Sequence, residues 1–138
     1  MRFSWLILFA LLTAPARAQT AKLTVDVQHI QAIKGKLQVA VFNSAAGFPD
    51  KAKPAQAKIV AVTGNPQQVV FDVAPGNYAL AVYQDENGNG KMDKKMFGIP
   101  TEPYGFSNNV RPKMSAPTFA DCQVAVPAAG KQISIRVQ

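Results

Sequence analysis

Strict alternation of apolar and polar residues is the feature that most constrains the fold of this 138-residue chain. Apolar side chains recur at every second position at Leu23, Val25 and Val27, and again along residues 37–41. A period of two places these side chains on one face of a strand, whereas a helix repeats after about 3.6 residues. No segment after residue 20 sustains a helical stripe. The pattern therefore predicts an all-β fold built from half-buried strands.

Similar apolar segments extend this prediction to about seven short strands. The further segments are residues 59–62, 69–73, 78–82, 123–126 and 132–137. The tight-turn sequence Pro75-Gly76-Asn77 predicts a hairpin between residues 69–73 and 78–82, because Pro fixes one φ and Gly or Asn accepts a positive φ. Strands with one polar face are typical of antiparallel sheets. We therefore expect a seven-stranded antiparallel β-sandwich with one long ordered loop, and a small closed barrel is the alternative.

Residues 1–18 have the features of a secretory signal peptide. Arg2 provides a positive start, an apolar run of about ten residues follows, and a small-x-small cleavage site ends at Ala18. The run is shorter than the roughly 20 residues that a membrane-spanning helix needs. We therefore expect an exported protein, periplasmic or extracellular, whose residues 19–138 form one domain without stable membrane insertion. An uncleaved N-terminal anchor is the alternative.

Charge in the predicted exported chain is positive but dispersed. The whole sequence has 15 basic and 8 acidic residues, and two of its arginines lie in the predicted signal, which leaves a net charge of about +5. The lysines form no dense run. Nucleic-acid-binding proteins usually cluster their charge and add stacking aromatics or a reading helix. We therefore expect no nucleic-acid partner, and at most weak attraction to anionic envelope surfaces.

A loop rich in Asp, Asn and Gly carries the clearest site chemistry. Side-chain oxygens recur at every second position from Asp85, and Gly90 at the sixth position suits the sharp turn of a calcium loop. The expected ligands are the side chains of Asp85, Asn87, Asn89, Asp93 and Glu102 and the carbonyl of Lys91. The twelfth position is Met96 rather than the bidentate Glu of an EF-hand. Few carboxylates predict weak calcium binding, with a dissociation constant of about 10⁻⁴ to 10⁻³ M.

The same residues also suit an ordinary turn. Asp and Asn side chains accept hydrogen bonds from their own backbone, and glycines adopt positive φ. Lys91, Lys94 and Lys95 lie nearby in the sequence and would oppose a cation. A loop without metal therefore remains the alternative.

Five segments together resemble a known bacterial family. They are GKLQVAVF (35–42), FP (48–49), PGNY (75–78), DENGNGKMD (85–93) and GIPTEPYGFSNN (98–109). The chain resembles domain-of-unknown-function family 2141 over nearly all of the predicted exported part. The resemblance implies an exported protein without assigned activity and a prealbumin-like or immunoglobulin-like β-sandwich, similar to the carboxypeptidase regulatory domain. Surface-protein repeats of that similar architecture carry calcium loops, which favours metal over a plain turn.

Residues after the predicted ion site form a candidate recognition loop. Its residues are Tyr104, Phe106, Ser107, Asn108 and Asn109. Two aromatics beside polar amides suit a small recognition surface for a glycan, a peptide or an envelope protein. In the alternative interpretation, the two aromatics fix the loop to the sandwich and the polar side chains satisfy backbone groups. Exposure of Tyr104 and Phe106 would favour recognition.

Residues suited to catalysis are few. The lone Cys122 cannot form an internal disulfide in an oxidising compartment, and we expect it to be a small buried residue. His29 follows the first strand, where a surface role is the default, and one His with one Cys cannot make the usual zinc site. We therefore expect a non-catalytic envelope binding or accessory module. A purely structural secreted domain is the main alternative, and a hydrolase that uses Asp85 or Asp93 with calcium is the least favoured.

Overall fold

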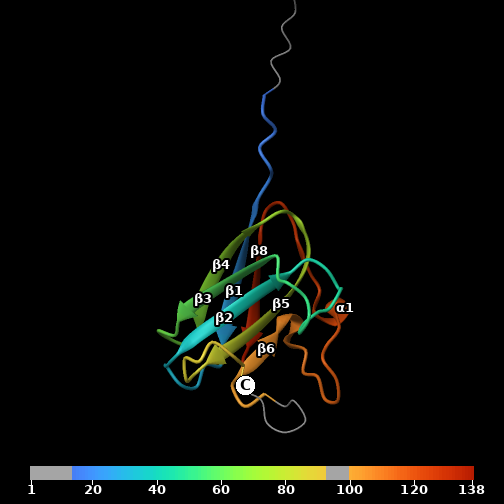
Figure 1. Cartoon of the computed structure of the whole chain (residues 1–138). Coiled ribbons are helices and arrows are strands. Elements are labelled where there is room, and N and C mark those ends of the chain that lie inside the picture. The colour runs from blue at the N-terminus through green and yellow to red at the C-terminus, as the bar shows by residue number, and fades with distance from the viewer. Residues whose placement is uncertain (1–13, 93–99) are drawn as a thin grey trace, which may run out of the picture.

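Two β-sheets packed over a common core make up the computed structural model, which describes residues 14–92 and 100–138. The described residues form eight strands and little helix. The strands are β1 (Ala21–Gln28), β2 (Lys36–Phe42), β3 (Gln56–Ala61), β4 (Gln67–Val73), β5 (Gly76–Asp85), β6 (Tyr104–Phe106), β7 (Val124–Val126) and β8 (Lys131–Arg136). A short 3₁₀ turn, η2 (Ser107–Asn109), and a one-turn helix, α1 (Phe119–Cys122), lie between β6 and β7. Figure 1 shows the sheets as two layers.

The smaller sheet has three strands in the order β4-β1-β8. β1 is antiparallel to β4, with Leu23 opposite Phe71, and parallel to β8, with Val25 opposite Ile133. A purely antiparallel arrangement was predicted, and the β1–β8 pair contradicts it. Parallel neighbours need a long crossover connection. Here the first and last strands pair, so nearly the whole chain serves as that connection.

The larger sheet has five strands, with the order β3-β2-β5-β6 and with β7 paired to the start of β5. β5 is the longest strand and is antiparallel to β2, β6 and β7. It begins beside β7 at Gly76 and ends at Asp85, where the Asp/Asn/Gly loop starts. β5 therefore connects the two ends of the sheet and carries the candidate loop.

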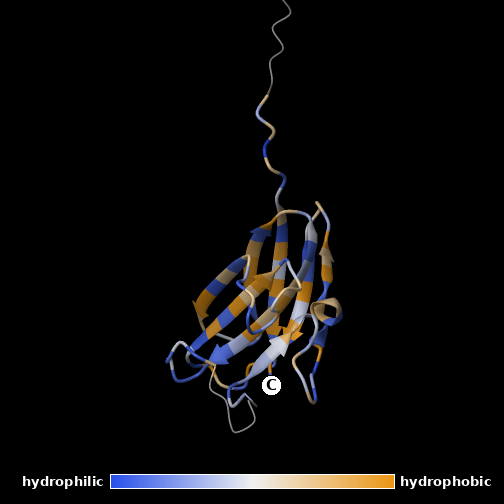
Figure 2. Ribbon diagram, turned by 45° about the vertical axis from the view of Figure 1, so that its right-hand side comes forward, coloured by the Kyte–Doolittle hydropathy of each residue, from blue (hydrophilic) through white to orange (hydrophobic). Residues whose placement is uncertain are grey.

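The core lies between the two sheets and contains the apolar positions of the alternating pattern. Leu23, Leu37, Phe71, Leu80 and Ile135 are all fully buried. Figure 2 shows hydrophobic and hydrophilic residues alternating along the strands. Burial of one such large apolar side chain contributes about 1.5 to 3 kcal/mol. The prediction of half-buried strands is confirmed for β1, β2 and β4, where buried positions alternate, whereas β3 is exposed at five of its six positions.

The predicted hairpin between residues 69–73 and 78–82 is wrong. β4 belongs to the smaller sheet and β5 to the larger, so the intervening turn passes from one layer to the other. The Tyr78 hydroxyl donates a hydrogen bond to the Ala74 carbonyl at 2.5 Å and holds this corner. The turn chemistry was recognised, but turn residues alone do not decide which strands pair.

The strand count also differs from the prediction of about seven. The additional strand, β6, is three residues long and lies inside the segment that was predicted to be a loop. It pairs with β5, with Tyr104 opposite Tyr83. The architecture is thus mostly β and sandwich-like, with two sheets and very little helix.

The described part of the predicted signal region lies outside this core. Residues 14–20 are exposed coil and extend away from the sheets (Figure 1). Among the described residues, the buried hydrophobic ones all lie between Ala21 and Val137, so a chain that starts at Gln19 retains the core that the structure describes. In the described part of the chain, no helix has the length and apolar character needed to cross a membrane.

Side chains of the edge strand β3 join the two layers. Gln56 donates to the Asp72 carbonyl at 2.6 Å, and the Lys58 ammonium donates to the Val70 carbonyl, both on β4. The Lys58 ammonium also lies 5.1 Å from the centroid of the Phe71 ring. Inward-pointing charges on an edge strand oppose pairing with another chain. The β3 edge is therefore closed by its own side chains.

We predict that Lys58→Ala lowers the free energy of unfolding by about 1 kcal/mol, because the Val70 carbonyl loses its donor and the Phe71 ring loses a cation. Lys131→Ala, at an exposed position on β8, is the matched control and should change stability by less than about 0.5 kcal/mol. Urea unfolding followed by circular dichroism measures both. Equal effects of the two substitutions would contradict the bridging role of Lys58.

Candidate functional site

Asp85 ends β5 and organises the loop that follows. Its side chain is 1% exposed. Oδ1 accepts a hydrogen bond from the Asn89 N–H at 3.2 Å, and Oδ2 accepts one from the Gly90 N–H at 2.7 Å. A carboxylate has about four acceptor positions. The Asp85 side chain therefore folds the loop around itself and keeps acceptor capacity for a further partner.

The side chains of Asn87 and Asn89 also accept hydrogen bonds from backbone N–H groups of the loop. Asn87 Oδ1 accepts from the Asn89 N–H at 3.1 Å, and Asn89 Oδ1 accepts from the Lys91 N–H at 2.8 Å. Gly88 and Gly90 have φ values of 72° and 77°, which suit glycine. These are the bonds expected of an ordinary turn, and they also bring several oxygen atoms to one loop.

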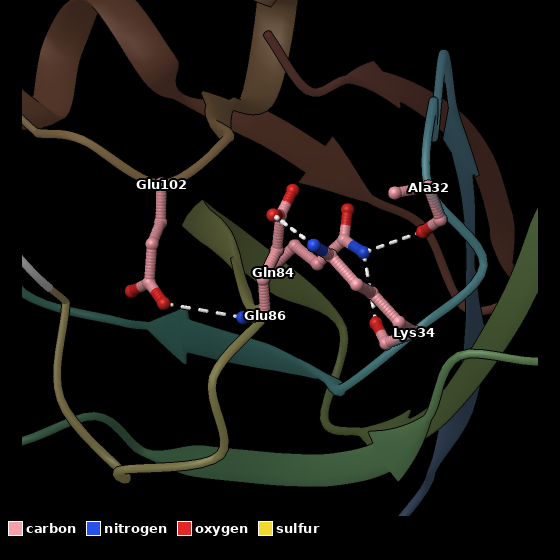
Figure 3. A network of polar contacts seen from close by, with 5 residues as sticks. All are labelled: Ala32, Lys34, Gln84, Glu86 and Glu102. Carbon is pink, nitrogen blue, oxygen red and sulfur yellow. Dashed lines mark hydrogen bonds and ion pairs between the residues drawn. The ribbon is translucent and has the colours of Figure 1, made fainter.

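Glu102 follows the loop in the sequence and contacts the backbone at the start of the loop. It is buried, and its Oε1 accepts the Glu86 N–H at 3.1 Å. The Glu86 carboxylate pairs with the Lys34 ammonium at 3.2 Å. Figure 3 shows Glu102 pointing at the Glu86 backbone and Lys34 reaching the Glu86 side chain. The two ends of the loop are thus tied by carboxylates.

Gln84 anchors the base of this network in the core. Its side chain is fully buried and its Nε2 donates to the carbonyls of Ala32 and Lys34 at 2.7 and 2.9 Å (Figure 3). Its Oε1 is buried and has no hydrogen-bond partner among the described residues. The amide therefore joins β5 to the connection between β1 and β2 and fixes where Asp85 emerges.

The residues proposed as calcium ligands are only partly brought together. Asp85 and Glu102 are the buried carboxylates at the two ends of the loop, and the side chains of Asn87 and Asn89 lie between them in the sequence. Asp93 falls outside the described residues. No group of three His, Cys, Asp or Glu side chains suitable for a metal occurs within the described ranges. A cation here would depend on amide and carbonyl oxygens as well as on carboxylates.

The predicted recognition residues lie on β6 and η2. Phe106 is 8% exposed and its ring contacts those of Tyr104 and Phe48 at centroid distances of 5.9 and 6.3 Å. Ser107 is fully buried. Its hydroxyl accepts the Leu80 N–H at 2.9 Å and donates to the Cys122 carbonyl.

Both asparagines of η2 bond to backbone groups. Asn108 donates from Nδ2 to the carbonyls of Asp121 and Gln123 at 3.1 and 3.0 Å, and Asn109 Oδ1 accepts the Arg136 N–H at 2.9 Å. These hydrogen bonds match the interpretation in which the polar side chains of this segment satisfy backbone groups. Tyr104 is half-buried and stays at the surface, where the Arg111 guanidinium lies 4.9 Å from its ring centroid.

The outward faces of the two sheets differ in chemistry. On the smaller sheet, the outward positions of β1 and β8 are Lys22, Thr24, Asp26, Gln28, Gln132, Ser134 and Arg136. On the larger sheet, the outward positions of β2, β3, β5 and β6 are Lys36, Gln38, Ala40, Phe42, Ala57, Ile59, Ala61, Ala79, Ala81, Tyr83, Asp85, Tyr104 and Phe106. The first face is polar, as expected for a solvated sheet, and the second is mostly apolar.

Three alanines form a shallow row across the larger sheet. The strand register sets Ala57 opposite Ala40 and Ala40 opposite Ala81, and the row ends at Phe106. The next row contains the larger side chains of Ile59 and Tyr83, among others. Small residues beside large ones leave a depression in the surface.

This depression is part of a groove of about 600 Å³, here called the outer-face groove. Its floor is the outward face of the larger sheet, and residues 112–117 supply one wall. Its other lining residues include Pro49, Asp50, Met92 and Pro100, and the wall includes Lys113. Ile59 is 61% exposed and Met114 is 98% exposed, although both are large and apolar. Exposed apolar side chains gathered in one depression are typical of an interaction surface.

Sequence reasoning did not identify this groove. One signal was present, because residues 78–83 of β5 form a nearly continuous apolar run, which is typical of a strand covered on both faces. The positions of Ala40 and Ala57 beside Ala81 depend on strand register, which the sequence does not give.

Packing covers one end of this outward face and leaves the other end open. Phe48 meets the rings of Phe42 and Phe119 edge to face, at centroid distances of 5.1 and 5.9 Å. Ala79 and Cys122 are fully buried beneath this aromatic group. The aromatic group therefore acts as a second, small core, and the outer-face groove begins where it ends.

Cys122 and His29, discussed above for catalysis and zinc binding, each have an environment that favours a structural role. Cys122 is buried as predicted, and burial, with a smaller effect of the Asp121 carboxylate, raises the pKa of its thiol to about 11. The thiol is therefore protonated at neutral pH and is a weak nucleophile. His29 is exposed with a φ of 67°, and its Nδ1 lies 3.0 Å from the Val137 carbonyl, which accepts the ring N–H.

These features define a sandwich-like β-domain with an Asx-rich loop beside an open apolar groove. The chain belongs to the bacterial family described as an uncharacterized protein conserved in bacteria (DUF2141), which matches residues 25–134. The match extends from β1 into β8 and includes both the loop and the groove. The family resemblance stated from the sequence motifs is confirmed. No curated protein and no solved structure gave a significant match.

We predict an alkaline loss of stability that depends on Cys122. The folded thiol has a pKa of about 11 against an ordinary value of 9.0, so the unfolded chain releases its proton first as the pH rises. Below about pH 9 both states hold the proton and the thiol has no effect. Between about pH 9 and 11, unfolding becomes easier by about 2 to 3 kcal/mol.

The measurement is urea unfolding of the native chain and of Cys122→Ala from pH 8 to 11. The difference between their free energies of unfolding should shrink across this range, because lysines and tyrosines titrate equally in both proteins. A constant difference would contradict the raised pKa.

Proposed function

We propose that this protein is an exported, non-catalytic binding module of the bacterial cell envelope whose recognition surface is the outer-face groove. The single observation that carries the proposal is the apolar outward face of the larger sheet, in contrast to the polar outward face of the smaller one. A structural domain has no need for an open apolar groove, because exposed apolar surface favours association. A prealbumin-like or immunoglobulin-like sandwich is the fold class that we propose for it.

The dimensions and lining of the groove support a binding role. Small-molecule sites usually have volumes of about 300 to 1,000 Å³ and apolar or aromatic walls with a few polar groups. The outer-face groove has about 600 Å³ and includes the rings of Tyr83 and Tyr104. Tyr104 thereby keeps the recognition role predicted for it, whereas the polar side chains of η2 serve the backbone.

We further propose that the loop after Asp85 binds calcium weakly and stabilises one side of the groove. Asp85 and Glu102 are buried carboxylates that already order the loop through N–H groups. Met92 and Pro100, on the two arms of this loop, line the groove. A cation that tightens the loop would therefore also fix these two residues.

A purely structural loop is the second candidate, and the turn bonds from Asn87 and Asn89 favour it. These bonds satisfy the backbone without any metal. The two candidates differ in the response of the folded protein to calcium, which a titration measures directly.

For the calcium titration we predict a saturable rise in melting temperature of the chain that starts at Gln19. At free calcium about tenfold above the dissociation constant, the stabilisation should be about 1.4 kcal/mol. Glu102→Gln should abolish the rise, since it removes the charge and keeps an oxygen that can accept the Glu86 N–H. Glu86→Gln is the matched control, because the Glu86 carboxylate pairs with Lys34. No rise up to about 10 mM calcium would establish the metal-free turn.

For the groove we predict that the neutral dye Nile red binds the folded chain and brightens. Ala57→Trp fills the groove floor at an exposed position of an edge strand and should abolish the signal. Ser134→Trp adds the same side chain to the outward face of β8 and should leave the signal unchanged. Circular dichroism verifies that both variants fold. A dye signal that is equal in all three proteins would contradict a binding surface in the groove.

A further inference from the structure

The chemistry of the groove floor restricts what can lie on it. The floor is formed largely by alanines, with Ile59 and Phe106 beside them and with Gln38 as a polar side chain between Ile59 and Tyr83. Alanine, isoleucine and phenylalanine side chains neither donate nor accept a hydrogen bond. A sugar hydroxyl pressed onto the alanine row would lose water without gaining a partner, at a cost of about 1 to 3 kcal/mol for each group. An apolar chain loses nothing there and buries its own surface.

An added peptide strand does not suit this surface either. A peptide that extends a sheet needs a free edge. Lys58 and Gln56 point inward from the β3 edge and bond to carbonyls of β4. At the β6 edge, the backbone of Tyr104 exchanges two hydrogen bonds of 3.2 Å with Gln138. An occupant therefore lies across the face rather than along an edge.

A second copy of the chain is also a poor occupant. A two-fold interface brings the same patch onto itself. Two concave grooves cannot fill each other, and the wall that contains Met114 and Lys113 would meet its own copy with like charges. The groove instead requires a slender convex ligand.

Charge at the rim decides which end group such a ligand has. Of the charged residues that line the groove, Lys58 points inward and donates to the Val70 carbonyl, which leaves Lys113 and the acidic Asp50 at the rim. Lys113 is exposed on the wall and follows Arg111 by two positions. The chain from Gln19 has a net charge of about +5. The rim next to Lys113 therefore favours an anion.

We propose that the outer-face groove binds a single-chain amphiphile, with its acyl tail on the alanine floor and its anionic head group beside Lys113. This inference rests on the proposed binding function and specifies the ligand class. The half-buried Tyr83 and Tyr104 rings flank the tail. The exposed Met114 side chain covers the tail from the opposite wall, as flexible thioether side chains do at adaptable apolar surfaces.

The test uses calorimetric titration of the chain that starts at Gln19 with laurate, myristate and palmitate, each below its micelle concentration. Full burial of one methylene tightens binding about fourfold, so a partly open groove should give about two- to fourfold for each added methylene. Dodecyltrimethylammonium, with a cationic head, should bind more weakly than laurate. Affinity that is independent of tail length, or equal for both head groups, would overturn the proposal.

Variants locate the two ends of the ligand. Lys113→Glu should weaken laurate about fivefold and strengthen the cationic amphiphile, while Lys131→Glu, the same change on the other sheet, should alter neither. Met114→Gln should weaken every tail, and because Met114 is fully exposed this change leaves the core intact. Equal effects of Lys113→Glu and Lys131→Glu would overturn the assignment of the head group.

Failure of the amphiphile is distinguishable from failure of the groove itself. In one outcome, Nile red binds the native chain but not Ala57→Trp, and an oligosaccharide or a peptide displaces the dye while fatty acids do not. This outcome overturns the amphiphile proposal and retains the proposed binding module. If the Nile red signal is the same for the native chain and for Ala57→Trp, both the amphiphile proposal and the proposed binding function are overturned. Displacement by fatty acids with the expected dependence on tail length supports both.

Discussion

Burial of β5, complete on its inner face and partial on its outer face, is the constraint on which the rest of the structure depends. Its inward side chains, among them Leu80 and Val82, close the core between the sheets, and its outward residue Ala79 lies beneath the aromatic group around Phe48. β5 also pairs with β2, β6 and β7. A strand covered in this way cannot shift its register by one residue, because every side chain would change face. The register in turn fixes the alanine row of the groove and the point where Asp85 leaves the sheet.

The loop after β5 and the segment after β6 both use buried side chains as hydrogen-bond partners for backbone groups. Both are long connections with many backbone groups that need partners. In the loop, Asp85 supplies acceptors to Asn89 and Gly90, whereas after β6 the buried Ser107 hydroxyl bonds both Leu80 and Cys122. A buried group left without its partner costs about 1 to 3 kcal/mol. Asp85 therefore orders the start of the loop that leads to Met92 of the groove, and Ser107 joins η2 to β5 and α1.

The asymmetry between the two sheet faces connects fold and function. Water hydrates the polar outward face of β1 and β8, whereas burial of the alanines and aromatics of the larger sheet is favourable. Phe48 and Phe119 cover one end with the protein's own chain. The other end stays open as the outer-face groove, with positive charge from Lys113 at its rim. We propose a binding module for this protein because its chain closes the second face only in part.

The sequence by itself determined the β class, the inward positions of β1, β2 and β4, the buried state of Cys122 and the family, since alternation and short motifs are local properties. It also identified the turn at Pro75, but not that this turn passes between sheets. The parallel β1–β8 pair, the strand β6, and the meeting of Ala40, Ala57 and Ala81 were decided by the tertiary structure. Each of these depends on which strands become neighbours and in which register. Pairing between residues far apart in the chain is set by how all buried faces pack at once, and no single segment contains that information.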